Sequence, residues 1–349
     1  MLLWLSSRIS TNGFVENKVR ELCGPILVLG ASGFVGANLI RSIAAVRKDV
    51  TGTASRLPAW RLDAPDLGTV VQLDLLAPGA LENLIATVRP RTVFNCVSYG
   101  AYSFETASDR IYQTNFNMTA RLLESLAAFN PKVRYIHAGS SSEYGENCAG
   151  PEETSHLAPN SEYAVSKAAA SQLIHFFGRK QGLLCCNLRL YSVYGPFEDS
   201  SRLIPNVVRQ GLAGGYPEFV DPAISRDFVY VDDVCEAFFD AALRLDEADF
   251  GQSFNIGTGV KTDIRTVAGI AAEIFGIEHP PAFTMPARRW DLGDWFANPE
   301  RAWARLGWKA RTGFHDGLVQ TARWYRDLPG AVRYERCSKF YEASVSQGH

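Results

Sequence analysis

The sequence has no excess of charge of either sign. Its 349 residues include 35 Lys and Arg against 37 Asp and Glu, which leaves a formal net charge of -2. Nucleic-acid-binding domains carry a strongly basic face, so this balance argues against a nucleic-acid partner. A chain of this length can also bury a sizeable core without disulfides or a structural metal.

Cysteines in metal-binding spacing are missing as well. The seven cysteines are an odd number, with no C-x-x-C pair and no Cys/His zinc pattern, so we predict no metal site. Cys96, Cys185 and Cys186 lie in apolar runs, as small buried hydrophobic residues do. Free thiols of this kind are typical of a reducing compartment, which predicts a cytoplasmic protein.

No segment of the sequence requires a membrane. Residues 22–40 carry no charge over 19 positions, close to the length of about 18 residues that indicates a membrane helix. They contain Pro25 and four glycines, however, so a strand, a turn and a helix explain them better. The apolar start of the chain, residues 1–5, is too short for a signal peptide.

The sequence does contain a regular alternation of short apolar strands and longer helices up to residue 190. Such alternation predicts parallel βαβ units and therefore an α/β fold with a doubly wound parallel (Rossmann) sheet. Beyond Tyr191, glycines and prolines loosen the pattern, which predicts a smaller C-terminal substrate-binding lobe at the sheet edge where such folds bind ligands. The expected parts are an N-terminal extension (1–24), a dinucleotide-binding domain (25–190, with 225–256 returning to it), the substrate-binding lobe (191–224 and 257–329) and a loosely held tail (330–349).

Three glycines spaced three residues apart follow the first predicted strand and open a helix. Glycine suits this position because a side chain would keep backbone N–H groups away from a pyrophosphate, whose charge a helix N-terminus attracts. A tight turn without a ligand is the alternative, but the strand before and the helix after favour dinucleotide binding. The predicted cofactor contacts at this turn are Gly30, Ser32, Gly33, Phe34, Val35 and Gly36.

The end of the second strand distinguishes the two nicotinamide dinucleotides. NAD sites usually place an acid there for the ribose hydroxyls, whereas NADP sites use an arginine for the 2′-phosphate. Residues 50–62 contain no acid, and Ser55 and Arg56 stand at its place. A solvated loop arginine is the alternative, but the missing carboxylate favours NADP(H), with NAD as second choice. Asp74 and Leu75, after the third strand, are adenine-contact candidates, although Asp74 is equally well explained as a turn residue.

Tyr163 and Lys167 stand four residues apart at the start of a predicted helix, which places phenol and ammonium on one face. A nearby cation stabilises a tyrosinate and so helps a tyrosine to exchange protons. Ser140, in a serine-rich strand end, lies 23 residues before Tyr163. Strand ends of a parallel sheet face the cofactor crevice, so these three groups are expected to converge.

Together these motifs resemble the extended short-chain dehydrogenase/reductase family of NAD(P)-dependent nucleotide-sugar epimerases, dehydratases and 4-ketoreductases. The resemblance implies an enzyme that acts on a nucleoside-diphosphate sugar and forms a homodimer. Besides the glycine turn and the Tyr/Lys pair, the segments that match in family order are 140–145, 189–196, 226–233, 254–257 and 306–308.

The resemblance also implies roles for individual residues. Tyr163 would exchange a proton with the sugar oxygen, and Lys167 would hold the nicotinamide ribose. Ser140 would hydrogen-bond the reacting oxygen, with Ser141 as the alternative, and Asn115 would kink its helix to support the site. The implied substrate contacts are Glu143, Ser192, Arg226 and Arg288, the two arginines for the diphosphate.

Departures from the family pattern decide the expected reaction. Dehydratases carry an acid pair where this chain has Ser141 and Ser142, Glu143 comes one position too late, and many 4-epimerases carry an asparagine in place of Ser192. We therefore expect NADP(H)-dependent reduction of a 4-keto nucleoside-diphosphate sugar, with Tyr163 as acid/base. A 4-epimerase with tightly bound NAD is the alternative. A non-catalytic dinucleotide sensor or scaffold is less favoured, because such proteins tend to lose the Tyr/Lys pair.

Overall fold

A seven-stranded sheet forms the centre of the computed structural model, which describes residues 12–102, 104–286, 291–328 and 334. Every neighbouring pair of its strands is parallel. The doubly wound α/β fold predicted from the sequence is confirmed. In spatial order the strands are β10 (Gln252–Ile256), β6 (Cys185–Leu190), β5 (Arg134–Ser140), β4 (Thr92–Asn95), β1 (Ile26–Leu29), β2 (Val50–Ala54) and β3 (Thr69–Gln72).

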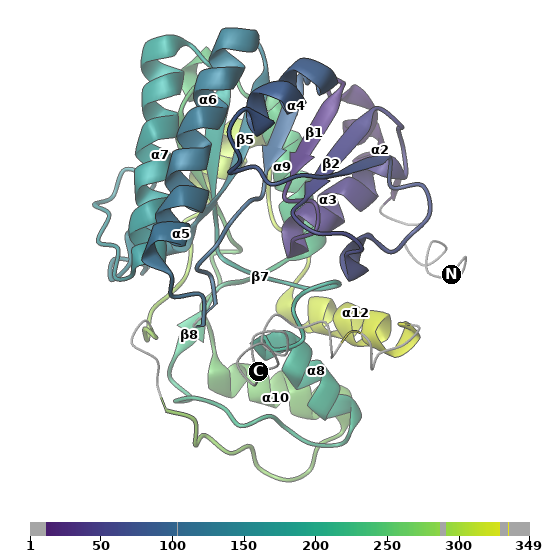
Figure 1. Cartoon of the computed structure of the whole chain (residues 1–349). Helices are drawn as coiled ribbons and strands as arrows, with labels where there is room; N and C mark the ends of the chain where they lie inside the picture. The colour runs from purple at the N-terminus through teal and green to yellow at the C-terminus, as the bar shows by residue number, and fades with distance from the viewer. Residues whose placement is uncertain (1–11, 103, 287–290, 329–333, 335–349) are drawn as a thin grey trace.

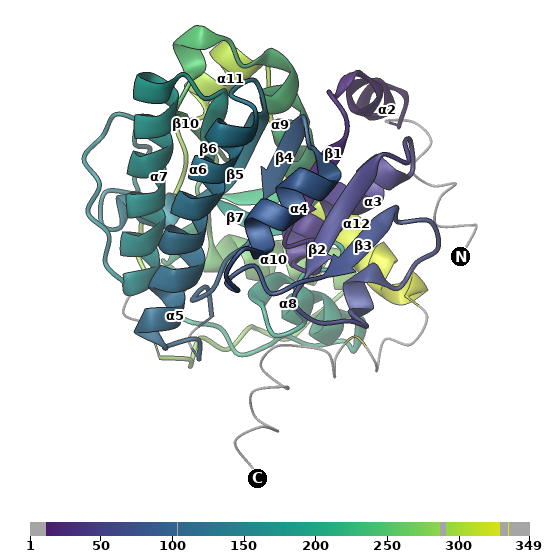
Figure 2. The same cartoon turned by 45° about the horizontal axis from the view of Figure 1, so that its top comes forward.

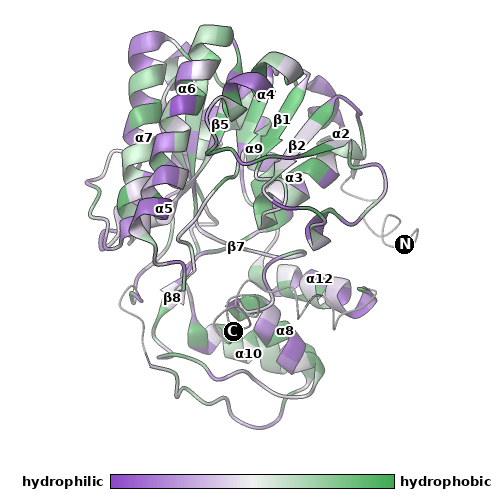
Figure 3. Ribbon diagram, in the orientation of Figure 1, coloured by the Kyte–Doolittle hydropathy of each residue, from purple (hydrophilic) through white to green (hydrophobic). Residues whose placement is uncertain are grey.

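Helices cover both faces of this sheet (Figures 1 and 2). On one face lie α3 (Phe34–Ala44) and α9 (Val231–Arg244), and on the other α4 (Ala80–Val88), α6 (Met118–Phe129) and α7 (Glu162–Gln181). Strand β1 shows why both faces need cover, because all four of its side chains are fully buried. Ile26 and Val28 pack with α3 and α9, whereas Leu27 and Leu29 pack with α4, α6 and α7. The sequence of the strand is therefore a continuous run of apolar residues. Figure 3 shows the hydrophobic strands covered by helices that have hydrophilic stretches on their outer side.

The C-terminal lobe lies beyond the carboxyl ends of the strands (Figure 1). Its helices share a separate core to which Val207, Val267 and Leu318 contribute. Within the described residues, no helix combines the length and apolar character needed to cross a bilayer. The elements of the lobe and its connections are α8 (Leu203–Leu212), α10 (Ile264–Phe275), α12 (Phe314–Asp327), β7 (Ser192–Tyr194) paired with β9 (Phe228–Tyr230), and β8 (Ser225–Arg226) paired with β11 (Thr262–Asp263). Helix α11 (Glu300–Leu306) falls in the range expected for the lobe but packs instead on α9 and β10 of the sheet domain, where Ala302 and Leu306 join the core (Figure 2).

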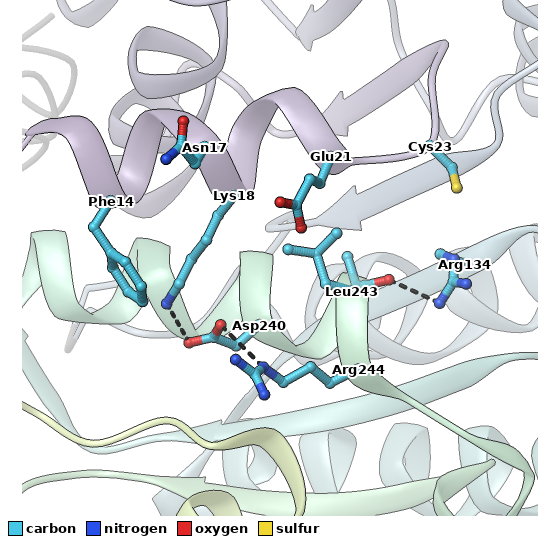
Figure 4. Close-up of a pocket in the computed structure, with 10 residues that line it drawn as sticks. Phe14, Asn17, Lys18, Glu21, Cys23, Arg134, Asp240, Leu243 and Arg244 are labelled. Atoms are coloured by element: carbon cyan, nitrogen blue, oxygen red, sulfur yellow. Dashed lines mark hydrogen bonds and ion pairs between the residues drawn. The ribbon is translucent and has the colours of Figure 1, made fainter.

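A helix that the sequence did not predict, α2 (Asn12–Glu21), packs against α9 (Figure 4). Lys18 Nζ lies 2.7 Å from Asp240 Oδ2 and 3.2 Å from Glu236 Oε2, and Val19 is fully buried. The apolar residues of this helix are few and lie among charged ones, so the sequence shows no clear amphipathic pattern there. Residues of both helices, Phe14 and Lys18 of α2 and Asp240 of α9 among them, line a pocket of about 520 Å³ beside this contact.

An aromatic cluster joins the lobe to the sheet domain. Phe197, Trp324 and Tyr334 are buried together, and the Trp60 ring lies 5.2 Å from the Tyr334 ring. The Tyr334 hydroxyl donates a hydrogen bond to the backbone carbonyl of Glu198 at 2.8 Å. The expectation of a loosely held tail beyond residue 330 is therefore not met at Tyr334, because its ring completes this cluster.

Candidate active site

The glycine turn is shaped by contacts that leave no room for side chains. Gly30 follows β1 with a φ of 74°, a conformation that favours glycine. A Cβ at Gly36 would lie 2.2 Å from the Gly30 carbonyl oxygen. Gly33 is the N-cap of α3, so the turn brings backbone N–H groups to a helix N-terminus. These features fit the pyrophosphate of a dinucleotide.

The residues expected to recognise the adenosine half lie at two strand ends. Ser55 and Arg56 follow β2 directly, and both are exposed. Asp74 is also exposed, and its Oδ1 accepts a hydrogen bond from the backbone N–H of Leu76 at 3.0 Å. The structure thus shows the turn role of Asp74, while its contact with adenine, and that of the half-buried Leu75, stays a prediction.

Tyr163 and Lys167 lie in the first turns of α7, which begins at an N-cap where Ser161 Oγ accepts from the N–H of Ala164. Lys167 is 2 % exposed, and its Nζ donates to the carbonyl of Ala138 in β5 at 2.9 Å. The same Nζ lies 5.9 Å from the centre of the Tyr163 ring. The lysine thus links the half-buried tyrosine to the end of β5.

Ser140 and Ser141 differ in the environment of their hydroxyls. Ser140 ends β5, is half-buried, and its Oγ lies 2.7 Å from Ser142 Oγ. Ser141 is 4 % exposed, and its Oγ accepts a hydrogen bond from Trp295 Nε1 at 2.9 Å. The hydroxyl of Ser141 is therefore engaged by Trp295 in the interior, whereas Ser140 is the more exposed of the two, which favours Ser140 as the serine that meets a ligand.

Glu143 lies beneath the site rather than in it. The residue is fully buried, and its Oε2 pairs with Arg189 Nε at 2.8 Å. Its Oε1 accepts from the backbone N–H of Ser140 and from Asn187 Nδ2, both at 3.1 Å. The expected contact between Glu143 and a substrate is thus corrected, because the carboxylate has no exposed surface and already anchors the end of β5.

Asn115 occupies a π-helical turn, Gln113–Asn117, between α5 (Ser108–Tyr112) and α6. Its Nδ2 donates to the Tyr99 carbonyl at 2.8 Å and to Ser166 Oγ at 2.9 Å. Its Oδ1 accepts from the Tyr99 N–H at 2.9 Å. The side chain therefore ties the loop after β4 to the helix that carries the Tyr/Lys pair.

Arg226, which was expected to bind the substrate diphosphate, lies on the short strand β8. Arg226 Nη2 lies 2.8 Å from Asp291 Oδ1, and its guanidinium stacks 4.8 Å from the centre of the Trp295 ring. A substrate diphosphate would have to share Arg226 with Asp291. Ser192 is half-buried at the start of β7, and Arg288 lies outside the described residues.

Two buried acids were not singled out from the sequence. Asp227 is fully buried and accepts hydrogen bonds from the backbone N–H groups of Thr258, Gly259 and Ala297 at 2.8, 2.8 and 3.0 Å. Asp227 directly follows Arg226 within the family motif at residues 226–233, and this position could have indicated its supporting role. Glu198 follows a Gly-Pro-Phe turn, but its burial could not be read from that pattern.

Across the part of the chain that the structure describes, no three His, Cys, Asp or Glu residues gather where they could hold a metal ion. The six cysteines of that part are free thiols. Burial raises the pKa of Cys96, which directly follows β4, to about 12, so its thiol stays protonated.

Comparisons with known proteins agree with this geometry. The model of the NAD dependent epimerase/dehydratase family matches residues 26–257. A trifunctional UDP-glucose 4,6-dehydratase/UDP-4-keto-6-deoxy-D-glucose 3,5-epimerase/UDP-4-keto-L-rhamnose-reductase of Arabidopsis thaliana is 26% identical and covers 87% of this chain. Only 47% of that relative is matched, so this chain spans about half its length.

Two solved structures are similar over almost their whole length. The UDP-glucose 4-epimerase of Thermotoga maritima, solved with UDP-glucose, is 26% identical with a TM-score of 0.79 and covers 86% of this chain and 98% of its own. MoeE5, in complex with UDP-glucuronic acid and NAD, is 29% identical with a TM-score of 0.75 and covers 87% and 99%.

Proposed function

Because the chain belongs to the NAD dependent epimerase/dehydratase family, we propose that it is an NAD(P)-dependent enzyme acting on a nucleoside-diphosphate sugar. This family membership confirms the resemblance predicted from the motifs. The names of its relatives include dehydration, epimerisation and reduction. The residues at the end of β5 must therefore distinguish these reactions.

We further propose that the reaction is the reduction of a 4-keto nucleoside-diphosphate sugar. The observation that carries this proposal is the chemistry at the end of β5, where Ser141 and Ser142 stand at the positions of a dehydratase's acid pair. The following acid, Glu143, is buried against Arg189 and has no surface with which to assist the loss of water. Hydroxyls next to the Tyr/Lys pair suit the orientation and protonation of a carbonyl oxygen.

The proposed mechanism uses three side chains of this site. Ser140 Oγ hydrogen-bonds the substrate carbonyl and orients it, and the Tyr163 hydroxyl delivers a proton to the same oxygen as negative charge develops on it. Lys167, held by the Ala138 carbonyl, places its cation next to the tyrosine and favours the phenolate that remains. When bound, the nicotinamide cofactor supplies the hydride.

The proposed cofactor is NADP(H). The glycine turn fits either dinucleotide, and the choice rests on the exposed Ser55 and Arg56 that follow β2. An arginine there can pair with a 2′-phosphate, whereas the ribose of NAD would lack its usual carboxylate partner. NAD is the alternative, since MoeE5 was solved in complex with NAD.

Isotope transfer tests the proposed reaction. Enzyme, a 4-keto nucleoside-diphosphate sugar and NADPH deuterated at C4 of the nicotinamide should consume about one NADPH per sugar and leave deuterium at C4 of the product. Elimination of water from an unoxidised nucleotide sugar would reject the reductase. In that event Glu143 would have to leave its partner Arg189 to act as the acid.

A 4-epimerase is the second candidate, favoured by the likeness to the Thermotoga maritima enzyme. An epimerase returns the same hydride and keeps its cofactor, so the purified protein would carry tightly bound NAD. Interconversion of two nucleotide sugars with no net loss of NADPH would select this candidate. Binding of dinucleotide without turnover of any nucleotide sugar would select a sensor or scaffold instead.

We also propose that the enzyme works in the cytoplasm as a homodimer with no nucleic-acid or membrane partner. The balanced charge and free thiols support the compartment and the absence of a polyanionic partner. Light scattering at micromolar concentration should give twice the mass of the chain. A mass of one chain would reject the dimer.

A further inference from the structure

Residues 99–102, which lie between β4 and α5 and are called segment 99–102 below, pass beside the proposed catalytic tyrosine. Gly100 has a φ of 95°, a conformation that favours glycine. A Cβ at Gly100 would lie 3.5 Å from Tyr163 Cδ2 and 2.9 Å from Ile111 Cγ1. The backbone of this segment therefore borders the Tyr163 ring, and a shift of Gly100 changes the space that the ring can occupy.

The sheet domain holds segment 99–102 through its backbone N–H groups. Asn115 Oδ1 accepts from the N–H of Tyr99 at 2.9 Å. Glu105 is 7 % exposed, and its Oε2 accepts from the N–H groups of Gly100 and Tyr102 at 2.9 and 3.4 Å. These bonds tie the segment to α5 and to the π-helical turn on one side only.

Arg202 attaches the same segment to the lobe. It is the N-cap residue of α8, and its Nη2 donates to the backbone carbonyl of Ala101 at 2.9 Å. The centre of its guanidinium lies 4.2 Å from the centre of the Tyr102 ring, well within the range of a cation–π contact. One side chain thus bridges the lobe and the segment across 101 residues of sequence.

The two partners of this bridge are themselves well defined. The backbone N–H of Arg202 donates to the Asp199 carbonyl at 3.0 Å, and the helix that follows is anchored in the core of the lobe by Ile204 and Val207. Burial raises the pKa of Tyr102 to about 12, with Asp199 adding to the rise and Arg202 opposing it. The ring therefore stays a neutral phenol, and its contact with the guanidinium does not change over the pH range of an ordinary assay.

We propose that Arg202 is a positioning residue for Tyr163 and acts through segment 99–102. By holding Ala101 and Tyr102 from the lobe, it keeps Gly100 against the ring that delivers the proton. The inference rests on the proposed function, in which Tyr163 is the acid. Proton delivery depends on the position of the hydroxyl to within a fraction of an ångström, so a loosened neighbour lowers the rate of the chemical step rather than ligand affinity.

A set of three variants tests the effect on catalysis with NADPH and UDP-4-keto-6-deoxy-D-glucose as the probes. Arg202→Ala removes both contacts and should lower kcat about tenfold or more, with KM for each probe within about twofold of the wild type. Arg202→Lys keeps a cation that reaches a carbonyl and a ring, so kcat should stay within about threefold of the wild type. Arg209→Ala is the matched control, because Arg209 Nη2 donates within α8, to Asn206, and kcat should not change.

Amide hydrogen exchange, followed by mass spectrometry on the unliganded proteins, gives a readout that does not depend on turnover. The N–H groups of Gly100 and Tyr102 exchange when their bonds to Glu105 open. Arg202→Ala should speed exchange in segment 99–102 about tenfold, and Arg202→Lys by much less. Exchange in α6 should be the same in all proteins, which shows that the variants are folded.

The remaining outcomes overturn the inference, each in a different way. Unchanged exchange in Arg202→Ala would show that the arginine does not hold the segment. Faster exchange at an unchanged kcat would show that the segment does not position Tyr163. A raised KM for the sugar nucleotide at an unchanged kcat would make Arg202 a direct substrate contact, and an equal loss of kcat in Arg202→Lys would exclude rescue by a cation. Faster exchange in Arg202→Ala, together with a wild type that reduces no 4-keto nucleotide sugar, would reject the proposed function and with it the role at Tyr163.

Discussion

The buried pair of Glu143 and Arg189 makes a quantitative prediction about stability. The two side chains are 0 % and 3 % exposed, and Glu143→Gln would leave the arginine charge without its partner in the interior. Removing one member of a buried ion pair typically costs about 3–5 kcal/mol, because the remaining charge stays desolvated. Glu143 also accepts from the Ser140 N–H, so the end of β5 loses an anchor in addition. We expect Glu143→Gln to lower the free energy of unfolding by about 3–5 kcal/mol.

Equilibrium unfolding in urea, followed by tryptophan fluorescence and by circular dichroism, measures this loss. Glu146→Gln, at an exposed position in the same segment, is the matched control and should change stability by less than about 0.5 kcal/mol. The reasoning is refuted if Glu143→Gln unfolds like the wild type and instead raises the KM for the sugar nucleotide. That result would place Glu143 in contact with substrate, as the sequence alone suggested.

Three further predictions concern catalysis, cofactor choice and pH. Tyr163→Phe should bind cofactor normally but lower kcat by about 10²–10⁴, whereas Lys167→Ala should impair both cofactor binding and rate; near-normal turnover of Tyr163→Phe in a stopped-flow assay would contradict the site. Arg56→Ala should raise the KM for NADPH about tenfold or more and leave that for NADH nearly unchanged, and an equal effect on both would contradict the NADP(H) proposal. Burial raises the pKa of Glu198 to about 8, so the folded protein binds a proton at this residue more tightly than the unfolded chain does. Its contribution to stability is full below about pH 4.5 and is lost as pH rises to about 8, so wild type should lose more stability than Glu198→Gln between pH 6 and 9, measured by urea unfolding.

Motifs that are local in sequence could be predicted well. The glycine turn lies between a strand and a helix that adjoin it in the chain, and Tyr163 and Lys167 share one helix. Strand β1 was also clear, because a strand buried on both faces shows itself as four apolar residues in a row. The right-handed βαβ connection narrows the possible strand orders of such a sheet, and the packed structure shows the one adopted.

Contacts between distant segments could not be predicted in this way. Glu143 meets Arg189 across 46 residues, and Lys18 of α2 meets Asp240 across 222. The periodicity of the sequence carries no information about contacts over such separations. Glu143 was therefore interpreted as a substrate contact, and the residues of α2 as part of a polar extension. The protonation state of Glu198 depends on its burial in a loop that packs against three other segments. Only the packed structure reveals this environment.

The aromatic cluster around Tyr334 has a mechanical consequence for ligand exchange. Separation of the lobe from the sheet domain would pull the Trp60 ring, which follows β2, away from the rings of Phe197 and Tyr334, whose centres lie 6.1 and 5.2 Å from it. A buried aromatic ring covers about 150–250 Å², so re-exposing one of them costs about 4–6 kcal/mol. We therefore expect the packing of Tyr334 to slow the opening of the crevice without touching the reacting groups.

Such packing should affect the rate of ligand release rather than the rate of the chemical step. Tyr334→Ala should speed the release of bound dinucleotide, measured by stopped-flow displacement, and leave the rate of a single turnover nearly unchanged. A slower single turnover at an unaltered release rate would show that the ring supports the chemistry itself. If release of the oxidised cofactor is the slowest step of this enzyme, a tag or truncation that disturbs Tyr334 should alter its steady-state rate.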